Sequence, residues 1–159
     1  MRKKLAYVLA NFEDLLIALF FTNMCIFIGL QIVARFFFNS AILFAEEISR
    51  YSYVWICFIG MAVGVKMNNH IKVDVVFLVI KDSKAQKIIT LVINLISVGL
   101  YLMLAIIGIQ YTSANYEQLS PAMELSKGFI YISIPLGALL AVLRFFPIIQ
   151  GNINELRKG

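Results

Sequence analysis

The chain has 159 residues, of which 61% are hydrophobic and 14% are charged. Soluble domains are about 45–50% apolar and about 25% charged, so this composition predicts a membrane protein, and the length allows one compact unit. The formal net charge of +5 does not indicate nucleic-acid binding, because the basic residues lie between apolar segments and form no single patch.

The first predicted element is a transmembrane helix over residues 15–35. Leu15 to Ala34 is a run of 20 residues without a charge, and about 20 apolar residues cross a bilayer as a helix. The basic start of the chain could open a signal peptide, but Glu13 and Asp14 interrupt the apolar run and no small-residue cleavage site follows it. We therefore expect an uncleaved first span.

The second predicted span covers residues 44–66 and must include charged residues. Its charge-free part, Tyr51–Val65, has 15 residues and would reach about 22 Å, whereas a hydrocarbon core is about 30 Å thick. Extending the helix at both ends places the charges between Glu46 and Arg50 at one boundary of the bilayer and Lys66 at the other.

Five polar residues are expected to gather at one boundary of the first two spans: Arg35, Asn39, Glu46, Glu47 and Arg50. The glutamates precede Arg50 by four and three positions, so both can reach it on a helix. We interpret the group as a clamp between helix ends or a contact with another subunit, because charges in such places are usually paired or face protein. An ion or proton site and ordinary interfacial solvation are the alternatives.

The middle of the second span carries aromatic and small residues. Tyr51 and Trp55 fit either an aromatic belt or helix packing, and the mid-span position of Trp55 favours packing. Five glycines are candidates for close helix approach: Gly60, Gly64, Gly99, Gly108 and Gly137. Among them only Gly60 and Gly64 have the four-residue spacing.

Residues 70–80 are predicted to form an interfacial helix between the second and third spans. Their first half alternates like a strand, but a lone strand at a membrane would leave its edges unpaired. His70, the only histidine, is expected to form a hydrogen bond, with Asp74 as the candidate partner. A haem-binding anchor subunit of a respiratory enzyme would need more axial ligands than this one.

The third and fourth spans are predicted at residues 88–114 and 128–147, and Pro135 should kink the last helix or loosen one turn. Lysines and arginines number 11 in the termini and the second loop against 3 in the other two loops, which predicts that both termini are cytoplasmic. The sequence therefore predicts an all-α integral membrane protein with four transmembrane helices in one domain over residues 1–159.

No catalytic constellation is evident in the sequence. It contains no nucleophile and base pair, phosphate loop or metal cluster, so we expect neither an enzyme nor a bound cofactor. A small four-helix proton-coupled exporter that acts as a homo-oligomer is an alternative function, but it needs an acidic residue well inside a span.

Two blocks of residues resemble the DctQ-type small membrane subunit of tripartite ATP-independent periplasmic (TRAP) transporters. The first block contains Gln31-Ile-Val-Ala-Arg35, Asn39, Glu46-Glu47, Arg50, Trp55, Gly60 and His70-Ile-Lys-Val-Asp74. The second contains Ser120-Pro121-Ala122, Tyr131 and Ile134-Pro135-Leu136-Gly137. The resemblance covers the whole chain, and the spacing across the first two spans is its most specific part.

The resemblance implies a multi-pass subunit of the bacterial inner membrane that supports transport performed elsewhere. A large membrane subunit would carry the sodium and substrate sites and move as an elevator, and a periplasmic protein would capture an organic acid such as a C4-dicarboxylate or a sialic acid. The small subunit would help to hold the fixed scaffold. We expect the outer loop to lie close to the docked binding protein, through Ser120, Pro121, Glu124 and Lys127.

Overall fold

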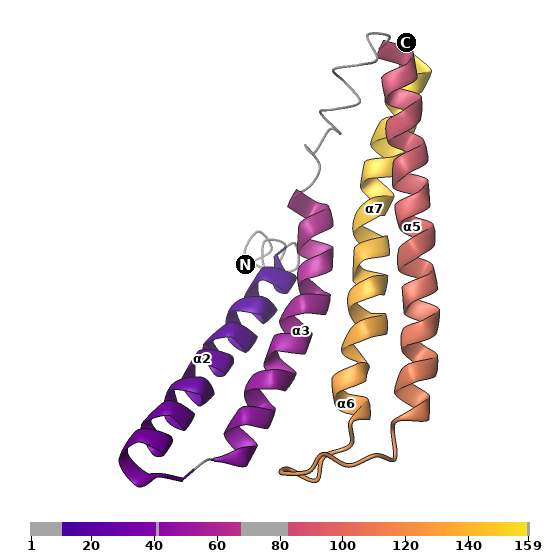
Figure 1. Ribbon diagram of the computed structural model, residues 1–159. Coiled ribbons are helices and arrows are strands. Elements are labelled where there is room, and N and C mark those ends of the chain that lie inside the picture. The colour runs from indigo at the N-terminus through magenta and orange to yellow at the C-terminus, as the bar shows by residue number, and fades with distance from the viewer. Residues whose placement is uncertain (1–10, 41, 68–82, 159) are drawn as a thin grey trace, which may run out of the picture.

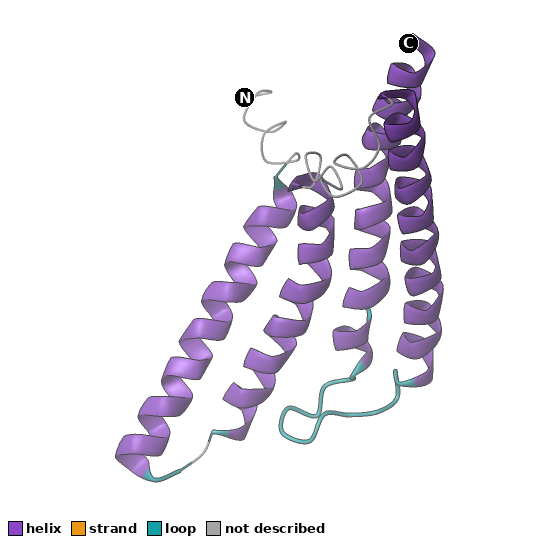
Figure 2. Cartoon of the chain, turned by 45° about the horizontal axis from the view of Figure 1, so that its top comes forward, coloured by secondary structure: helices purple, strands orange, loops and turns teal. Residues whose placement is uncertain are grey.

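The computed structural model describes residues 11–40, 42–67 and 83–158, and this part of the chain is almost entirely helical (Figures 1 and 2). The helices are α2 (Phe12–Phe38), α3 (Leu43–Met67), α5 (Ser83–Ala114), α6 (Gly128–Tyr131) and α7 (Ser133–Lys158). Four stretches are long and apolar enough to cross a membrane, with α6 and α7 together making the fourth. The prediction of an all-α protein with four transmembrane helices is confirmed.

The long helices stand side by side in the order α2, α3, α7, α5. The end of α2, the start of α3 and the 115–127 connection lie at one end of this row, which we call the loop end (Figure 1). The opposite end, where α2 begins and α3 and α7 finish, is called the terminal end. There α5 and α7 reach well beyond α2 and α3 (Figure 1).

The two edge helices, α2 and α5, are less buried within the chain than the two central helices, α3 and α7. In the apolar segments of α2 and α5, 0% and 11% of the residues are buried within the chain, against 28% in α3 and 33% in α6–α7. A helix that is apolar all round and unburied within its own chain is suited to lipid or to another membrane protein.

Small residues let α3 and α7 approach closely at the centre of the row. Ala62 and Ala141 are completely buried beside Val65 and Phe145. A Cβ atom added at Gly137 would collide with the backbone carbonyl of Phe58, so this crossing requires glycine.

The expected role of the glycine pair in α3 is wrong within this chain. Nothing in the described structure lies within 4 Å of a Cβ atom built at Gly60 or Gly64. The expectation is confirmed at Gly137 and at Gly108, where a Cβ would lie 2.8 Å from Ile134 Cγ2 and 2.9 Å from Pro135 Cδ.

The predicted spans fall on the helices, although α5 begins at Ser83, five residues before the predicted third span. The predicted fourth span stopped at residue 147, whereas α7 continues through Pro147 to Lys158. Pro135 has no N–H to donate to the carbonyl of Tyr131, and α6 ends at that residue, which is the loosened turn that the sequence predicts. The predicted interfacial helix at 70–80 lies outside the described residues.

Candidate functional site

A buried carboxylate at the loop end joins α3 to the 115–127 connection. Glu47 is only 2% exposed. Its Oε2 accepts a hydrogen bond of 2.9 Å from the Ser120 hydroxyl and one of 3.0 Å from the Met123 backbone N–H. The Tyr51 hydroxyl lies beside the same carboxylate. The hydrogen bonds to Oε2 offset part of the cost of burying the charge, while Oε1 is buried without a hydrogen-bond partner among the described residues. Glu47 therefore fixes the connection to the helix row.

The connection itself is a narrow hairpin. The Ser120 N–H donates to the Leu125 carbonyl, and the Lys127 N–H donates to the Gln118 carbonyl. The donor–acceptor distance is 2.8 Å in both hydrogen bonds. Glu124 turns the chain with a φ of 53°, in the left-handed region. A Cβ at Gly128 would lie 2.5 Å from the Tyr116 ring, so glycine lets the hairpin return closely onto the end of α5.

The predicted charge clamp at this end forms only in part. Arg50 Nη2 lies 3.8 Å from Glu46 Oε1, and both side chains are more than half exposed. Glu47 points away to Ser120, so the expectation that both glutamates reach Arg50 is wrong. Arg35 and Asn39 are exposed and form no ion pair or hydrogen bond with any other described side chain; Asn39 ends α2 in the left-handed conformation with a φ of 48°.

The four residues predicted for the outer face occupy different environments. Ser120 is buried against Glu47. Pro121 and Glu124 are exposed, while Lys127 is half-buried with its Nζ 3.3 Å from Gln118 Oε1. His70 and Asp74 lie outside the described residues. Ser120 is therefore used within the chain, whereas the other three residues keep exposed surface.

A shallow groove of about 230 Å³ separates the middle of α2 from α3. Its lining residues are Leu19, Phe20, Asn23, Ile48, Tyr51, Ser52 and Trp55. The rings of Phe20 and Trp55 stack with centroids 5.4 Å apart, which confirms the packing role expected of Trp55. The Ser52 hydroxyl donates to Asn23 Oδ1 over 3.1 Å. These contacts hold α2 on α3 and offer no acid–base pair.

Two ion pairs at the terminal end join three helices. Arg144 of α7 holds Glu13 of α2 through two hydrogen bonds of 2.8 and 2.5 Å, and Glu13 is 1% exposed. Lys66 of α3 lies 2.8 Å from Asp14 and donates to Asn11 over 2.6 Å. The sequence reading missed both pairs. The sequence did contain a signal for the first pair. Arg144 lies inside the last apolar run, near the same membrane boundary as the acidic residues at the start of the first span.

The charged groups also define the depth of the row in a membrane. Glu47 and Lys66 are 19 residues apart on α3, or about 29 Å, and Asp14 and Arg35 are 21 apart on α2, or about 32 Å. Both spacings match a hydrocarbon core of about 30 Å. The polar clusters at the two ends therefore fall at the two boundaries, with apolar helix between them.

These contacts are structural in kind, and nothing in the described residues resembles a catalytic or metal centre. No group of three or more histidine, cysteine, aspartate or glutamate side chains that could hold a metal ion occurs in residues 11–40, 42–67 and 83–158. What the arrangement can do is keep four helices in a fixed order and at a fixed depth.

Comparison with known proteins gives a consistent result. Residues 24–149 match the family described as tripartite ATP-independent periplasmic transporters, DctQ component. The chain is 28% identical over 127 residues to a Haemophilus influenzae protein named as a TRAP transporter small permease protein, covering 80% of this chain and 74% of that protein.

Two further relatives have more specific names. The sialic acid TRAP transporter small permease protein SiaQ of Vibrio cholerae is 25% identical over 148 residues, which cover 89% of this chain and 82% of SiaQ. The isethionate TRAP transporter permease protein DctMQ of Oleidesulfovibrio alaskensis is 28% identical over 119 residues, 72% of this chain but 18% of that protein.

Proposed function

Because the chain belongs to the DctQ component family of tripartite ATP-independent periplasmic transporters, we propose that it is the scaffold subunit that holds a large permease subunit in place. The family is a transporter permease component and not an enzyme, and TRAP small subunits work with a large membrane subunit and a substrate-binding protein. The scaffold role, the transport cycle and the substrate are parts of the proposal.

The observation that carries the proposal is the fixation of the helix row at both ends. Glu47 holds the loop end through Ser120 and Met123, and Arg144 holds Glu13 at the terminal end. A row that is locked at both boundaries cannot slide one helix past another, whereas its apolar flanks α2 and α5 stay free to contact a neighbour. Rigidity together with unburied apolar flanks suits a support better than a moving part.

In the proposed arrangement the terminal end faces the cytoplasm and the loop end faces the periplasm of a bacterial inner membrane. The excess of basic residues in the termini and the second loop supports this orientation. Sodium and an organic acid would bind to the large subunit. The names of the sialic acid and isethionate relatives support an organic anion as the substrate class.

Exposed charges at the loop end are the proposed contacts with the other components. Arg50, with Glu46 beside it, and Arg35 would face the large subunit. Pro121, Glu124 and Lys127 would lie near the docked binding protein. Exposed ion pairs contribute about 0–1 kcal/mol to folding, so these residues can be changed without unfolding the chain.

The proposal is tested by co-purification in mild detergent. A tagged chain should retain a large multi-span subunit, and Arg50→Glu should reduce the amount retained, because it places two acidic side chains one helical turn apart at the contact. Arg157→Glu is the matched control, since Arg157 is an exposed arginine at the opposite end. Normal co-purification and normal uptake with Arg50→Glu would contradict the proposed contact, and failure of the unaltered chain to retain any large subunit would contradict the scaffold role.

A further inference from the structure

The 115–127 connection carries large apolar side chains that its own hairpin does not cover. Leu119 is 59% exposed and Leu125 is 45% exposed, although both flank the buried Ser120–Glu47 contact. Tyr116 and Phe129, where the connection meets its flanking helices, are exposed as well. A connection that stood clear of the membrane would present these side chains to water, at a cost in apolar hydration.

The hydrogen bonds to Glu47 determine how far this connection can rise from the membrane. Glu47 lies about 29 Å along α3 from Lys66, so it marks one boundary of the hydrocarbon core. Ser120 and Met123 are bonded directly to its carboxylate. The hairpin is therefore held at that boundary, and Leu119 and Leu125, next to the bonded residues, lie within the interfacial layer.

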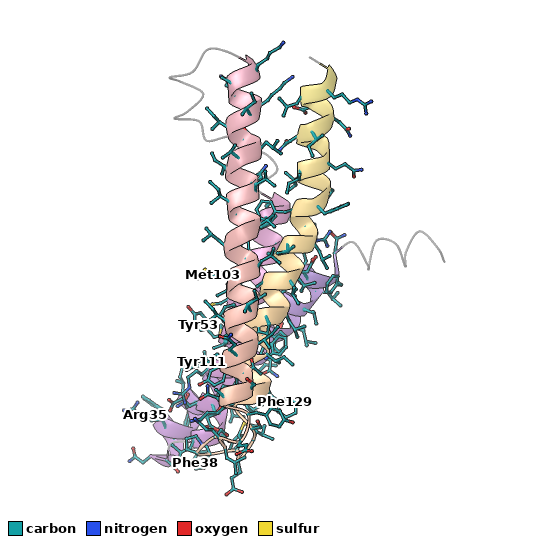
Figure 3. All side chains as sticks on the ribbon, turned by 90° about the vertical axis from the view of Figure 1, so that its right-hand side faces the viewer. Arg35, Phe38, Tyr53, Met103, Tyr111 and Phe129 are labelled. Carbon is teal, nitrogen blue, oxygen red and sulfur yellow. The ribbon has the colours of Figure 1, made fainter. Side chains whose placement is uncertain are left out.

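A second apolar group lies at the same level on the other side of the row. Phe36, Phe37 and Phe38 are highly exposed and directly follow Arg35, which lies about 32 Å from Asp14. In Figure 3 the labels show that Phe38 and Phe129 both lie toward the loop end of the row. Exposed aromatic side chains therefore continue the apolar surface of α2 beyond Arg35 at the loop end.

We propose that the 115–127 connection lies flat in the membrane interface, with Leu119 and Leu125 against the outermost part of the acyl chains, and that Glu47 sets this depth. The partner of this surface is the lipid bilayer itself. Aromatic and leucine side chains at the headgroup level are typical of such contacts. The polar tip at Glu124 then remains in water, because a carboxylate is costly to place among acyl chains.

Single-cysteine labelling can distinguish a side chain in the membrane interface from one in water. Cys25 and Cys57 are replaced by alanine, and a polarity-sensitive fluorophore is attached at Leu119→Cys, or at Glu124→Cys as the matched control. The full chain, with any large subunit that co-purifies, is reconstituted into vesicles containing a lipid with a nitroxide near its headgroup. We expect several-fold stronger quenching by the nitroxide lipid at residue 119 than at residue 124, and the reverse order with aqueous iodide.

Two results would overturn the proposal. Equal iodide quenching at both positions would place the whole hairpin in water, and protection of residue 119 from both quenchers would show that protein covers it. Leu125→Cys repeats the measurement independently, in case one label disturbs the hairpin. Adding Glu47→Ala to the Leu119→Cys chain should raise iodide quenching several-fold, and unchanged quenching would refute the role of Glu47 in setting the depth.

Discussion

Removal of Arg144 should destabilise the chain far more than removal of an exposed arginine. Arg144→Met leaves the Glu13 carboxylate buried with neither of its two short hydrogen bonds. Breaking a buried pair from one side costs about 3–5 kcal/mol, which is a factor of roughly 150–5,000 in the unfolding equilibrium. Glu13→Gln should cost less, about 1–3 kcal/mol, because the Arg144 side chain is 26% exposed and can turn to solvent.

The assay is unfolding of the full chain by SDS in mixed micelles. Trp55 reports it, because it is the chain's one tryptophan and stacks on Phe20 across the α2–α3 contact. Arg50→Met is the control and should cost less than about 1 kcal/mol, since its ion pair is exposed. The double variant Glu13→Met with Arg144→Met should recover most of the loss, because no buried charge remains. Equal costs for Arg144→Met and Arg50→Met, or no recovery in the double variant, would refute the reasoning.

Two further predictions concern the row and its hairpin. Gly137→Ala should lower stability by about 1–3 kcal/mol in the same assay, since the new methyl group meets the backbone of α3, whereas Gly60→Ala, in open space, should be neutral or stabilising by up to about 1 kcal/mol. Glu47→Ala should leave two donors of the hairpin without their acceptor, at about 1–3 kcal/mol, and limited proteolysis should then cut between residues 115 and 127. Glu46→Ala, one residue away and exposed, should leave the digestion pattern unchanged.

The transmembrane helices could be predicted from the sequence because their cause is local. A charge-free run of about 20 residues has to form a helix in lipid, since every backbone polar group must be satisfied within it. This argument placed α2 to within a few residues, and the thickness of the hydrocarbon core placed α3 by extending its shorter charge-free part. The predicted fourth span ends at Pro147, but the helix does not. A proline inside a helix removes one hydrogen bond, and α7 continues past it.

Side-chain partners were harder to predict because they depend on which helices become neighbours. Glu47 and Arg50 have a favourable spacing on one helix, yet Glu47 bonds to Ser120, 73 positions away. A short-range ion pair in solvent contributes less than about 1 kcal/mol, so it cannot compete with hydrogen bonds from a buried hydroxyl and a backbone N–H. The spacing rule therefore identified the pair that forms, Glu46 with Arg50, and assigned the buried glutamate wrongly.

The ion pair of Arg144 with Glu13 could have been found by comparing the depth of each charge in the membrane, although sequence spacing does not reveal it. Arg144 interrupts the last apolar run about 16 residues after Gly128, and Glu13 interrupts the start of the first. In a row of helices that all cross one hydrocarbon core, each charge must find a partner at its own level or leave the membrane. An arginine and a glutamate that both fall near the boundary marked by Lys66 are the candidates for each other, although 131 positions separate them. The same criterion assigns Glu47 to the opposite boundary, where the hairpin supplies its donors.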